Sequence, residues 1–190
     1  SMPTPRKPKP GKSLAEVNPE LAKQWHPAKN GELNPNQVYS SQGIKVWWKC
    51  DKGDDHEWKS IIGGGCNVCS GHKVVKSNCL ATTHPEIAKQ WHPTNNGDLT
   101  PYDVFSRTSK NIWWKCEKAD DHEWLVAVRN RVGGSNCPMC SGHKVVKSNS
   151  LATTHPEIAK QWHPTKNGDL TPYDVTKGSG KKFWWKCNKA

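Results

Sequence analysis

The sequence predicts a small α+β fold repeated in tandem, with a short helix and a β-hairpin in each repeat. Three segments of nearly identical sequence, residues 19–33, 85–99 and 156–170, align without a gap and establish the repetition. The 190 residues are only 33% hydrophobic and include eleven Trp but two Phe and two Met. Because this composition is poorly suited to one large aliphatic core, several small units are expected.

The repeats differ in length at one place. Trp91 follows Trp25 by 66 residues and precedes Trp162 by 71. The extra residues lie between the HEW motif and the following C-x-x-C pair of the second repeat. The first repeat therefore has a shortened loop there.

These offsets define the expected domains. They are a disordered basic arm at 1–12, a first repeat at 13–78, a second at 79–149, and a partial third at 150–190 that lacks the histidine and the final cysteine pair. The segment GHKVVKSN, at 71–78 and 142–149, joins successive repeats. It has no proline and little glycine, so we expect a short ordered connection rather than a flexible linker.

The helix of each repeat is predicted by the residues at its two ends. A candidate N-cap is followed by proline and then glutamate, which are favoured in the first helical turn. In PEIAKQW, at 85–91, the helix ends at His92 because the residue before Pro93 is pushed out of the helical region. A turn follows, and then one further capped turn around Pro101. The equivalent N-cap positions are Asn18, His84 and His155.

Two runs rich in Trp and β-branched residues predict the hairpin. They are KNIWWKC at 110–116 and HEWLVAV at 122–128, and they flank a polar turn. Side chains alternate between the faces of a strand, so one of Trp113 and Trp114 is expected in the core and the other outward. Trp124, like its first-repeat equivalent Trp58, is expected in the core.

Each complete repeat carries four residues of metal-ligand type in a fixed order. The spacing is C-x5-H-x9-C-x2-C in the first repeat and C-x5-H-x14-C-x2-C in the second. Two close pairs of sulfur and nitrogen ligands suit tetrahedral zinc, and four protein ligands leave no position for a catalytic water. The predicted ligands of two structural zinc ions are Cys50, His56, Cys66 and Cys69, and Cys116, His122, Cys137 and Cys140.

Other uses of the cysteines fit the sequence less well. A thioredoxin-like redox pair explains C-x-x-C but not the upstream Cys and His. Disulfides are disfavoured because C-x-x-C pairs beside ligand-type histidine are the intracellular metal pattern. Cys187 aligns with Cys50 and Cys116 but lacks their downstream partners, so the third zinc site is incomplete in this sequence. Cys79 aligns with serines of the other repeats and is expected to be a small buried or capping residue.

The motifs together resemble a known family. The string WHPTKNGDLTPYDV, with WWKC, HEW and CPMCSGHKV, is similar to a bacterial family described as a probable zinc-ribbon or treble-clef zinc-finger domain. The resemblance covers nearly the whole chain from about Ser13. It implies tandem zinc-ribbon or treble-clef repeats, a small metal-bound α+β fold and the same eight ligands. Its members are sometimes fused to nuclease domains resembling the very short patch repair endonuclease.

The sequence departs from the family pattern at the first ligand pair. The knuckles CDKGDDH and CEKADDH are one residue longer than the usual form and lack its proline. No catalytic residue is predicted, because Asp54, Asp55 and Glu57 lie in a knuckle where a solvated turn is favoured over an acid–base site. The interrupted third repeat leads us to expect a fragment of a longer protein, with a nuclease domain as a candidate beyond Ala190.

The chain is strongly basic, with a formal net charge of +11 and a pI of about 9.3. This charge favours a polyanionic partner such as nucleic acid or an acidic surface, with simple solubility as the alternative explanation. Together with the arginines of the second repeat's longer loop, the nuclease fusions that the family resemblance implies make DNA the expected nucleic acid. No apolar run approaches the ~18 residues of a membrane span and no signal peptide is visible, so we expect an intracellular protein with no membrane partner and no small-molecule substrate. The candidate nucleic-acid contacts are Lys49, Lys73, Lys115, Arg129, Arg131, Lys144 and Lys186.

Two functions from different classes fit the sequence. The first is a non-catalytic zinc module that binds nucleic acid and targets a larger protein, with lysines on phosphates and an outward indole stacked on bases. Arg129 and Arg131, in the longer loop of the second repeat, are the candidates for phosphate or base-edge contacts. The alternative is a protein-interaction scaffold, in which outward Trp residues hold a partner and the lysines increase solubility.

Overall fold

The chain forms two compact units in a computed structural model that describes residues 6–187. The first unit comprises the chain up to Thr83 together with Pro101–Ser106, and the second comprises His84–Thr100 and the chain from Arg107 onward. The second repeat therefore contributes to both units. Of the basic arm predicted at 1–12, residues 1–5 lie outside the described part.

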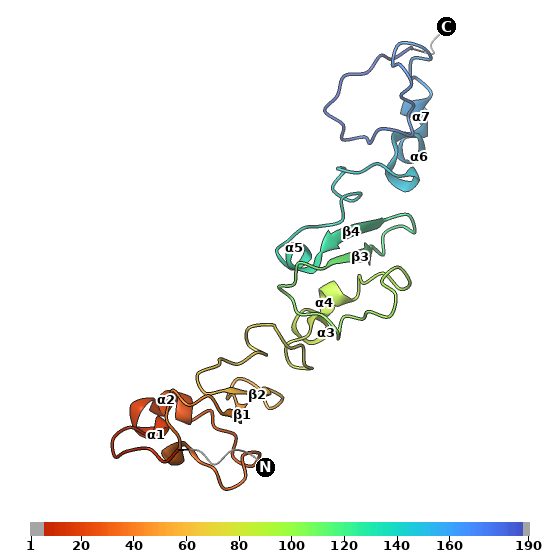
Figure 1. Cartoon of the computed structure of the whole chain (residues 1–190). Helices are drawn as coiled ribbons and strands as arrows, with labels where there is room; N and C mark the ends of the chain where they lie inside the picture. Colours follow the sequence, from red (N-terminus) through yellow and green to blue (C-terminus); the bar gives the residue numbers. More distant parts are fainter. Residues whose placement is uncertain (1–5, 188–190) are drawn as a thin grey trace. The chain divides into compact units, whose positions relative to one another are not determined.

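Short helices accompany a two-stranded hairpin in each unit (Figure 1). The first unit contains α1 (Leu14–Val17), α2 (Pro19–Ala22), η1 (Pro35–Gln37), β1 (Lys45–Lys49), β2 (Glu57–Ile61) and α3 (Leu80–Thr83). The second contains α4 (Pro85–Ala88), β3 (Asn111–Lys115), β4 (Glu123–Ala127), α5 (Val128–Val132), η2 (Lys147–Asn149), α6 (Leu151–Thr154) and α7 (Pro156–Ala159). The predicted small α+β class is confirmed.

The predicted helices begin at the expected prolines but end earlier than expected. α2, α4 and α7 start directly after the predicted N-cap positions, yet each ends at an alanine after four residues. In the first repeat the helix ends because the backbone of the residues that follow α2 hydrogen-bonds to strand β1. The Lys49 N–H donates to the Gln24 carbonyl at 2.7 Å, and the His26 N–H donates to the Trp47 carbonyl at 3.1 Å.

A second short helix, which the sequence analysis missed, precedes each of these. It is α1, α3 or α6, and its first leucine is buried in all three cases. A small buried residue stands before that leucine: Ser13, Cys79 and Ser150 are at most 3% exposed. Cys79 is therefore the small buried residue that its alignment predicted. The signal lay in the repeated S/C-L-A pattern, which is too short to show helical periodicity.

The hairpins have the register that the paired tryptophans require. β1 and β2 are antiparallel with Trp48 opposite Trp58, and β3 and β4 are antiparallel with Trp114 opposite Trp124. On the other edge of β1, the segment that follows α2 pairs with the strand through one isolated antiparallel β-bridge, between Trp25 and Trp48. The predicted hairpins are thus confirmed, each widened by one residue pair.

The core of the first repeat is built around one indole. Trp48 is fully buried, with Trp25 edge-on at 5.5 Å between ring centroids and Trp58 stacked at 6.5 Å. Leu14 and Val38 belong to the same buried cluster. The outward partner Trp47 is half-buried, and Trp113 and Trp114 in the second repeat divide in the same way. The predicted split of the Trp pair is therefore confirmed in the two complete repeats.

The longer loop of the second repeat is mostly a helix. The strand expected through Val128 ends at Ala127, and α5 follows at once. Val128 is fully buried and its N–H donates to the Lys110 carbonyl, which anchors the start of the helix. Arg131 is only 9% exposed, so its expected place on a surface loop is corrected to a buried position.

The partial third repeat has the contact between two tryptophans that the other repeats have, but it lacks the second strand that packs over them. Trp162 bridges Trp185, with their rings edge-on at 5.3 Å. No second strand lies opposite Trp185 within the described residues, and this indole is 43% exposed whereas Trp48 is fully buried. The second strand is therefore what closes the core over this tryptophan.

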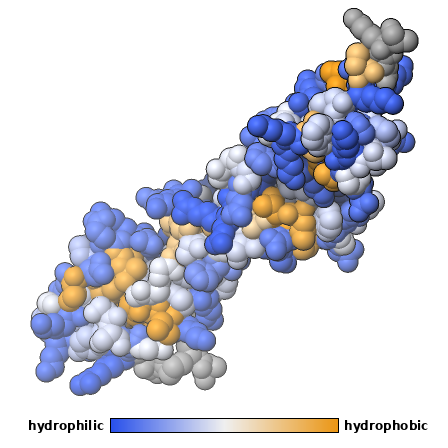
Figure 2. Space-filling model, turned by 90° about the horizontal axis from the view of Figure 1, so that it is seen from above, coloured by the Kyte–Doolittle hydropathy of each residue, from blue (hydrophilic) through white to orange (hydrophobic). Residues whose placement is uncertain are grey.

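The surface is mostly polar, with separate hydrophobic patches (Figure 2). Ile61 and Leu125, both on second strands of hairpins, are about half exposed, at 51% and 50%. Among the described residues, none of the helices is both long enough and apolar enough to cross a bilayer.

An asparagine side chain extends each hairpin. The Asn30 amide nitrogen donates to the Trp47 carbonyl at 2.8 Å, and the Trp47 N–H donates to the Asn30 oxygen at 2.7 Å. Asn96 makes the same pair of bonds with Trp113. The amide thus satisfies a backbone N–H that a neighbouring strand would otherwise have to satisfy, and it shares the carbonyl with the N–H of His26 or His92.

We predict that Asn30→Ala lowers the free energy of unfolding of the zinc-loaded protein by about 2 kcal/mol, because it leaves the half-buried Trp47 N–H without a partner and leaves the Trp47 carbonyl with the His26 N–H alone. Denaturant unfolding followed by tryptophan fluorescence measures this. The control is Asn36→Ala at an exposed position, where a change below about 0.5 kcal/mol is expected. Equal losses in the two variants would contradict the role assigned to Asn30.

Candidate metal centres

The hairpin positions the first ligand pair of each centre. In the first repeat Cys50 directly follows β1 and His56 directly precedes β2, and the Cys50 N–H donates to the His56 carbonyl at 3.0 Å. Cys66 and Cys69 stand on a tight turn, where the Cys69 N–H donates to the Cys66 sulfur at 3.4 Å. Two rigid turns therefore face each other, each presenting two ligands.

The ligand atoms of the first group have the spacing of a tetrahedral site. Cys50 Sγ and Cys69 Sγ are 3.8 Å apart, and His56 Nδ1 lies 3.8 Å from Cys66 Sγ and 3.4 Å from Cys69 Sγ. Bonds of about 2.3 Å to sulfur and about 2.0 Å to nitrogen would separate sulfurs by about 3.8 Å and sulfur from nitrogen by about 3.5 Å. The group fits zinc.

The second group repeats this geometry. Cys116 Sγ and Cys140 Sγ are 3.7 Å apart, and His122 Nδ1 lies 3.6 Å from Cys137 Sγ and 3.5 Å from Cys140 Sγ. All four ligand atoms in each group lie within 4.8 Å of one another. The sequence thus identified both sets of residues that the fold brings together. Cys187 is in neither group of the described residues, so the incomplete third site stays a prediction.

The thiols need a cation in order to ionise together. Burial, and then the neighbouring sulfurs, raise the pKa of Cys69 to about 12, and the pKa of Cys140 is raised to about 12 by the same causes. Zinc binds the thiolate form, so metal binding releases these protons and its affinity falls as the pH falls. With four protein ligands, zinc at either centre would organise structure and would have no open position for chemistry.

A hydroxyl and a carboxylate orient the histidine of the first centre. His56 directs Nδ1 to the sulfurs, and its Nε2 lies 3.1 Å from Ser77 Oγ. Ser77 Oγ donates to Asp55 Oδ1 at 2.6 Å, and the Ser77 N–H donates to Asp55 Oδ2 at 2.9 Å. These bonds lower the pKa of Asp55. Such partners fix the ring orientation and the tautomer of a ligand histidine.

The second centre has an equivalent serine and aspartate, but its histidine makes no hydrogen bond to the serine. Ser148 donates to Asp121 through Oγ, at 2.5 Å, and through its N–H, at 2.9 Å. His122 Nε2 is buried and has no hydrogen-bond partner within the described residues. The sequence analysis missed these serines and carboxylates, although their recurrence at equivalent positions of DDHEW and KSN was a usable signal.

In the first repeat a buried histidine ties the segment after α2 to the hairpin. His26 Nδ1 accepts the N–H groups of Ala28 and Lys29, at 3.1 and 3.2 Å, so Nε2 carries the proton and donates to Glu57 Oε1 at 3.0 Å. Glu57 also pairs with the Lys29 ammonium. Lys29 and then His26 lower the pKa of Glu57 to about 2. These residues brace the hairpin directly beside the ligand His56.

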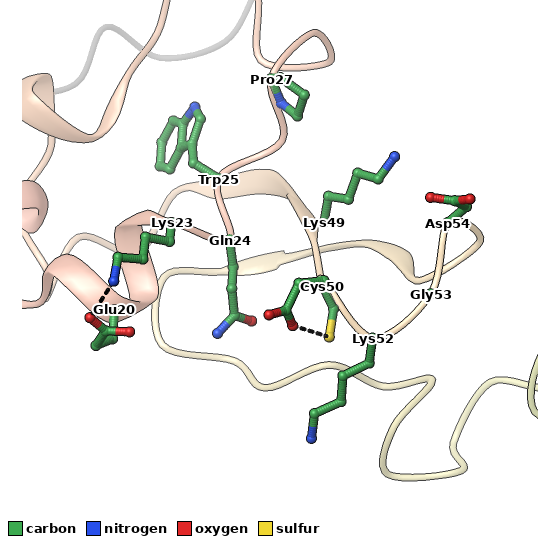
Figure 3. A pocket seen from close by; sticks show the side chains of 11 residues that line it. Glu20, Lys23, Gln24, Trp25, Pro27, Lys49, Cys50, Lys52, Gly53 and Asp54 are labelled. Atoms are coloured by element: carbon green, nitrogen blue, oxygen red, sulfur yellow. Dashed lines mark hydrogen bonds and ion pairs between the residues drawn. The ribbon is translucent and has the colours of Figure 1, made fainter.

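A charged hollow of about 550 Å³ lies beside Cys50 (Figure 3). Lys49 and Lys52 extend from its wall in different directions, and Glu20 pairs with Lys23 on the opposite side. Asp51 and Asp54 line the same hollow, so three acidic and three basic side chains surround it next to the first centre.

The predicted nucleic-acid contacts lie in three kinds of place. Arg129, Lys144 and Lys186 are exposed. Lys73 is also exposed, and its ammonium donates to the Glu57 carbonyl at 3.2 Å. Lys49 and Lys115 are half-buried, and the Lys115 ammonium lies 3.6 Å from the Glu123 carboxylate. Arg131 is buried, with its guanidinium bonded to Gln90 and Ser135. The surface prediction for Arg131 is thus corrected.

Comparison with known families agrees with this geometry. The sequence pattern of one family, described as "Probable Treble clef zinc finger domain", matches residues 21–72, 87–143 and 158–190. Each matched segment lies within one of the three predicted repeats. No curated protein matches the chain.

We predict that the undenatured protein contains two zinc ions per chain and that Cys137→Ser contains about one, because the variant removes a ligand of only the second group. Metal analysis by mass spectrometry measures both. Cys79→Ser, which introduces the residue found at this place in the other repeats, is the control and should retain two. Fewer than two zinc ions in the unmodified protein would contradict the assignment.

We also predict that Ser77→Ala weakens zinc binding at the first centre about tenfold, because His56 loses its partner. Chelator competition should be measured in a Cys137→Ser background, which leaves the first centre alone. Ser148→Ala, measured for the second centre in a Cys66→Ser background, is expected to have a smaller effect since His122 Nε2 makes no such bond. Equal effects at the two centres would argue against this role of the serine.

Proposed function

We propose that this chain, which belongs to the family of probable treble clef zinc finger domains, is a non-catalytic module that binds nucleic acid. The observation that supports this most is the combination of a net charge of +11 with an outward-facing indole on each hairpin. Zinc would act here by holding the hairpins in shape. Targeting of a longer protein, and DNA as the preferred nucleic acid, stay predictions.

The outward tryptophans are not equivalent. The Lys29 ammonium lies over the Trp47 ring, 4.9 Å from its centroid, and Lys166 lies over Trp184 at 4.7 Å. In the second repeat the equivalent position is Asn95, which bears no charge. Trp113 is therefore the outward indole best suited to stack on a base, since no lysine of that turn competes for its face.

The surroundings of Trp113 suit an unstacked base. A hollow of about 460 Å³ is walled by Trp113, Leu125 and Pro138. Asn136 and Ser135 supply polar groups at the same place, and the exposed Lys144 stands at its edge. An indole with an adjacent amide and ammonium offers stacking, hydrogen bonding and phosphate contact within one site.

Each of the two units carries cationic side chains that suit contacts to a phosphate backbone. Arg129 is exposed on α5, and Lys49 and Lys52 extend from the hollow beside Cys50 (Figure 3). Lysine and arginine contacts to phosphate supply most of the sequence-independent affinity of nucleic-acid binding, and this part weakens as salt increases. The proposal therefore requires affinity that depends strongly on salt.

A protein-interaction scaffold is the second candidate, and one observation favours it. Leu125 stands opposite Trp113 across the hairpin and is 50% exposed. In the first repeat Lys59 occupies that place opposite Trp47. An apolar pair on an outward face could receive the side chains of a protein partner instead of a base.

We predict that the protein binds mixed-sequence single strands and duplexes with a logarithmic affinity that falls linearly with the logarithm of the salt concentration. Fluorescence anisotropy at several salt concentrations measures this. Absence of binding even at low salt would exclude the nucleic-acid proposal and favour the protein-interaction scaffold.

We predict in addition that Trp113→Leu, which keeps apolar bulk but removes the stacking surface, weakens binding to a single strand by about tenfold. The matched control is Trp47→Leu on the first hairpin, where Lys29 already covers the ring, and a smaller loss is expected. If both variants bind as tightly as the unmodified protein, base stacking on these indoles is excluded.

A further inference from the structure

A buried arginine without a carboxylate partner lies next to the second metal centre. Arg131 is 9% exposed, and no ion pair to it is recorded among the described residues. Its nitrogens donate to the Gln90 side-chain oxygen at 2.8 Å and to the Ser135 carbonyl at 3.1 Å, and its Nε is buried without a hydrogen-bond partner. A buried cation of this kind requires a compensating negative charge.

The zinc centre would supply that charge. Zinc bound by three thiolates and one neutral histidine carries a net charge of about −1. Arg131 and the sulfur ligands Cys116, Cys137 and Cys140 line the same hollow of about 360 Å³. Burial lowers the pKa of Arg131, and the neighbouring sulfurs of Cys116 and Cys137 act in the opposite direction.

The hydrogen bonds of Arg131 also reach both sides of the centre. Ser135, whose carbonyl it binds, is two residues before Cys137. Gln90, whose side chain it binds, accepts the N–H of Lys115 through its own backbone carbonyl at 2.8 Å, directly before Cys116. The guanidinium is therefore held in place between the strand and the turn that carry the ligands.

The first centre has no counterpart of this residue. The five additional residues of the second repeat form most of α5, and the corresponding stretch before Cys66 is Gly63, Gly64 and Gly65. Each centre does have an equivalent exposed lysine two residues after its first cysteine, Lys52 or Lys118. The centres thus differ in one buried positive charge.

We propose that Arg131 is a charge-compensating positioning residue of the second zinc centre, and that the longer loop of the second repeat serves to place it there. The guanidinium stabilises the anionic zinc–thiolate group in its buried surroundings and slows the loss of zinc. This role concerns metal retention and does not depend on which macromolecule the protein binds.

The test uses the zinc-loaded full chain and the chelator 4-(2-pyridylazo)resorcinol, which reports released zinc. Alkylation of freed cysteines with N-ethylmaleimide, mapped by peptide mass spectrometry, assigns each release phase to Cys66 and Cys69 or to Cys137 and Cys140. Arg131→Met is expected to accelerate release from the second centre about tenfold or more, as loss of such partners does to metal affinity, with the first centre unchanged.

Two variants separate local charge from other effects. Arg129→Met removes an exposed charge from the same helix and should leave both release rates within about twofold of the unmodified protein, since exposed charges act weakly. Arg131→Lys keeps the positive charge and should recover most of the retention. Unchanged release in Arg131→Met, or equally fast release in Arg131→Lys, would overturn the proposal.

A third variant, which can be measured even if Arg131→Met fails to fold, tests the hydrogen bonds of Arg131 separately from its charge. Gln90→Ala removes one hydrogen bond of the guanidinium but leaves its charge in place. We expect the release rate of the second centre to change less in this variant than in Arg131→Met, because the positive charge is retained. A tenfold acceleration would show that the hydrogen bonds, and not the charge, are what matter, and would overturn charge compensation.

Discussion

The fold depends on the closure of each hairpin against a C-x-x-C turn by four metal-ligand side chains. A core as small as the cluster around Trp48 rarely supplies more than about 3–5 kcal/mol of stability, whereas zinc bound to a structural site contributes about 10–16 kcal/mol in apparent binding free energy. The tryptophans and the metal therefore have complementary roles. The indoles fill a thin core, and zinc bound at the two Cys/His groups would fix each C-x-x-C turn against its hairpin.

This arrangement explains why the outward face of the hairpin is available for recognition. Trp48 and Trp114 are fully buried in the cores of their repeats. Trp113 on the opposite face contributes its backbone to Asn96 and leaves its ring half-exposed beside a hollow. The partial third repeat shows the dependence on the second strand, because Trp185 without that cover is 43% exposed.

Repetition made most of the fold and both ligand sets predictable from the sequence. Cys and His spacing recurs in register, and alternation along a strand separates Trp113 from Trp114 without any tertiary knowledge. The helices before Pro19 and Pro85 were missed because four residues carry no periodic signal. Arg131 was misplaced because local sequence shows a basic loop, whereas its burial follows from Gln90, which lies 41 residues away along the chain. Side-chain contacts over such distances are set by packing and leave no local pattern.

The most direct test of this account is a zinc titration of the reduced, metal-free chain followed by near-ultraviolet circular dichroism of the tryptophans. The account predicts a weak signal without metal, since the indoles pack only when the hairpins are closed, and a signal that rises until two equivalents of zinc have been added. A full native-like signal before any zinc is added would contradict the claim that metal coordination holds the fold together.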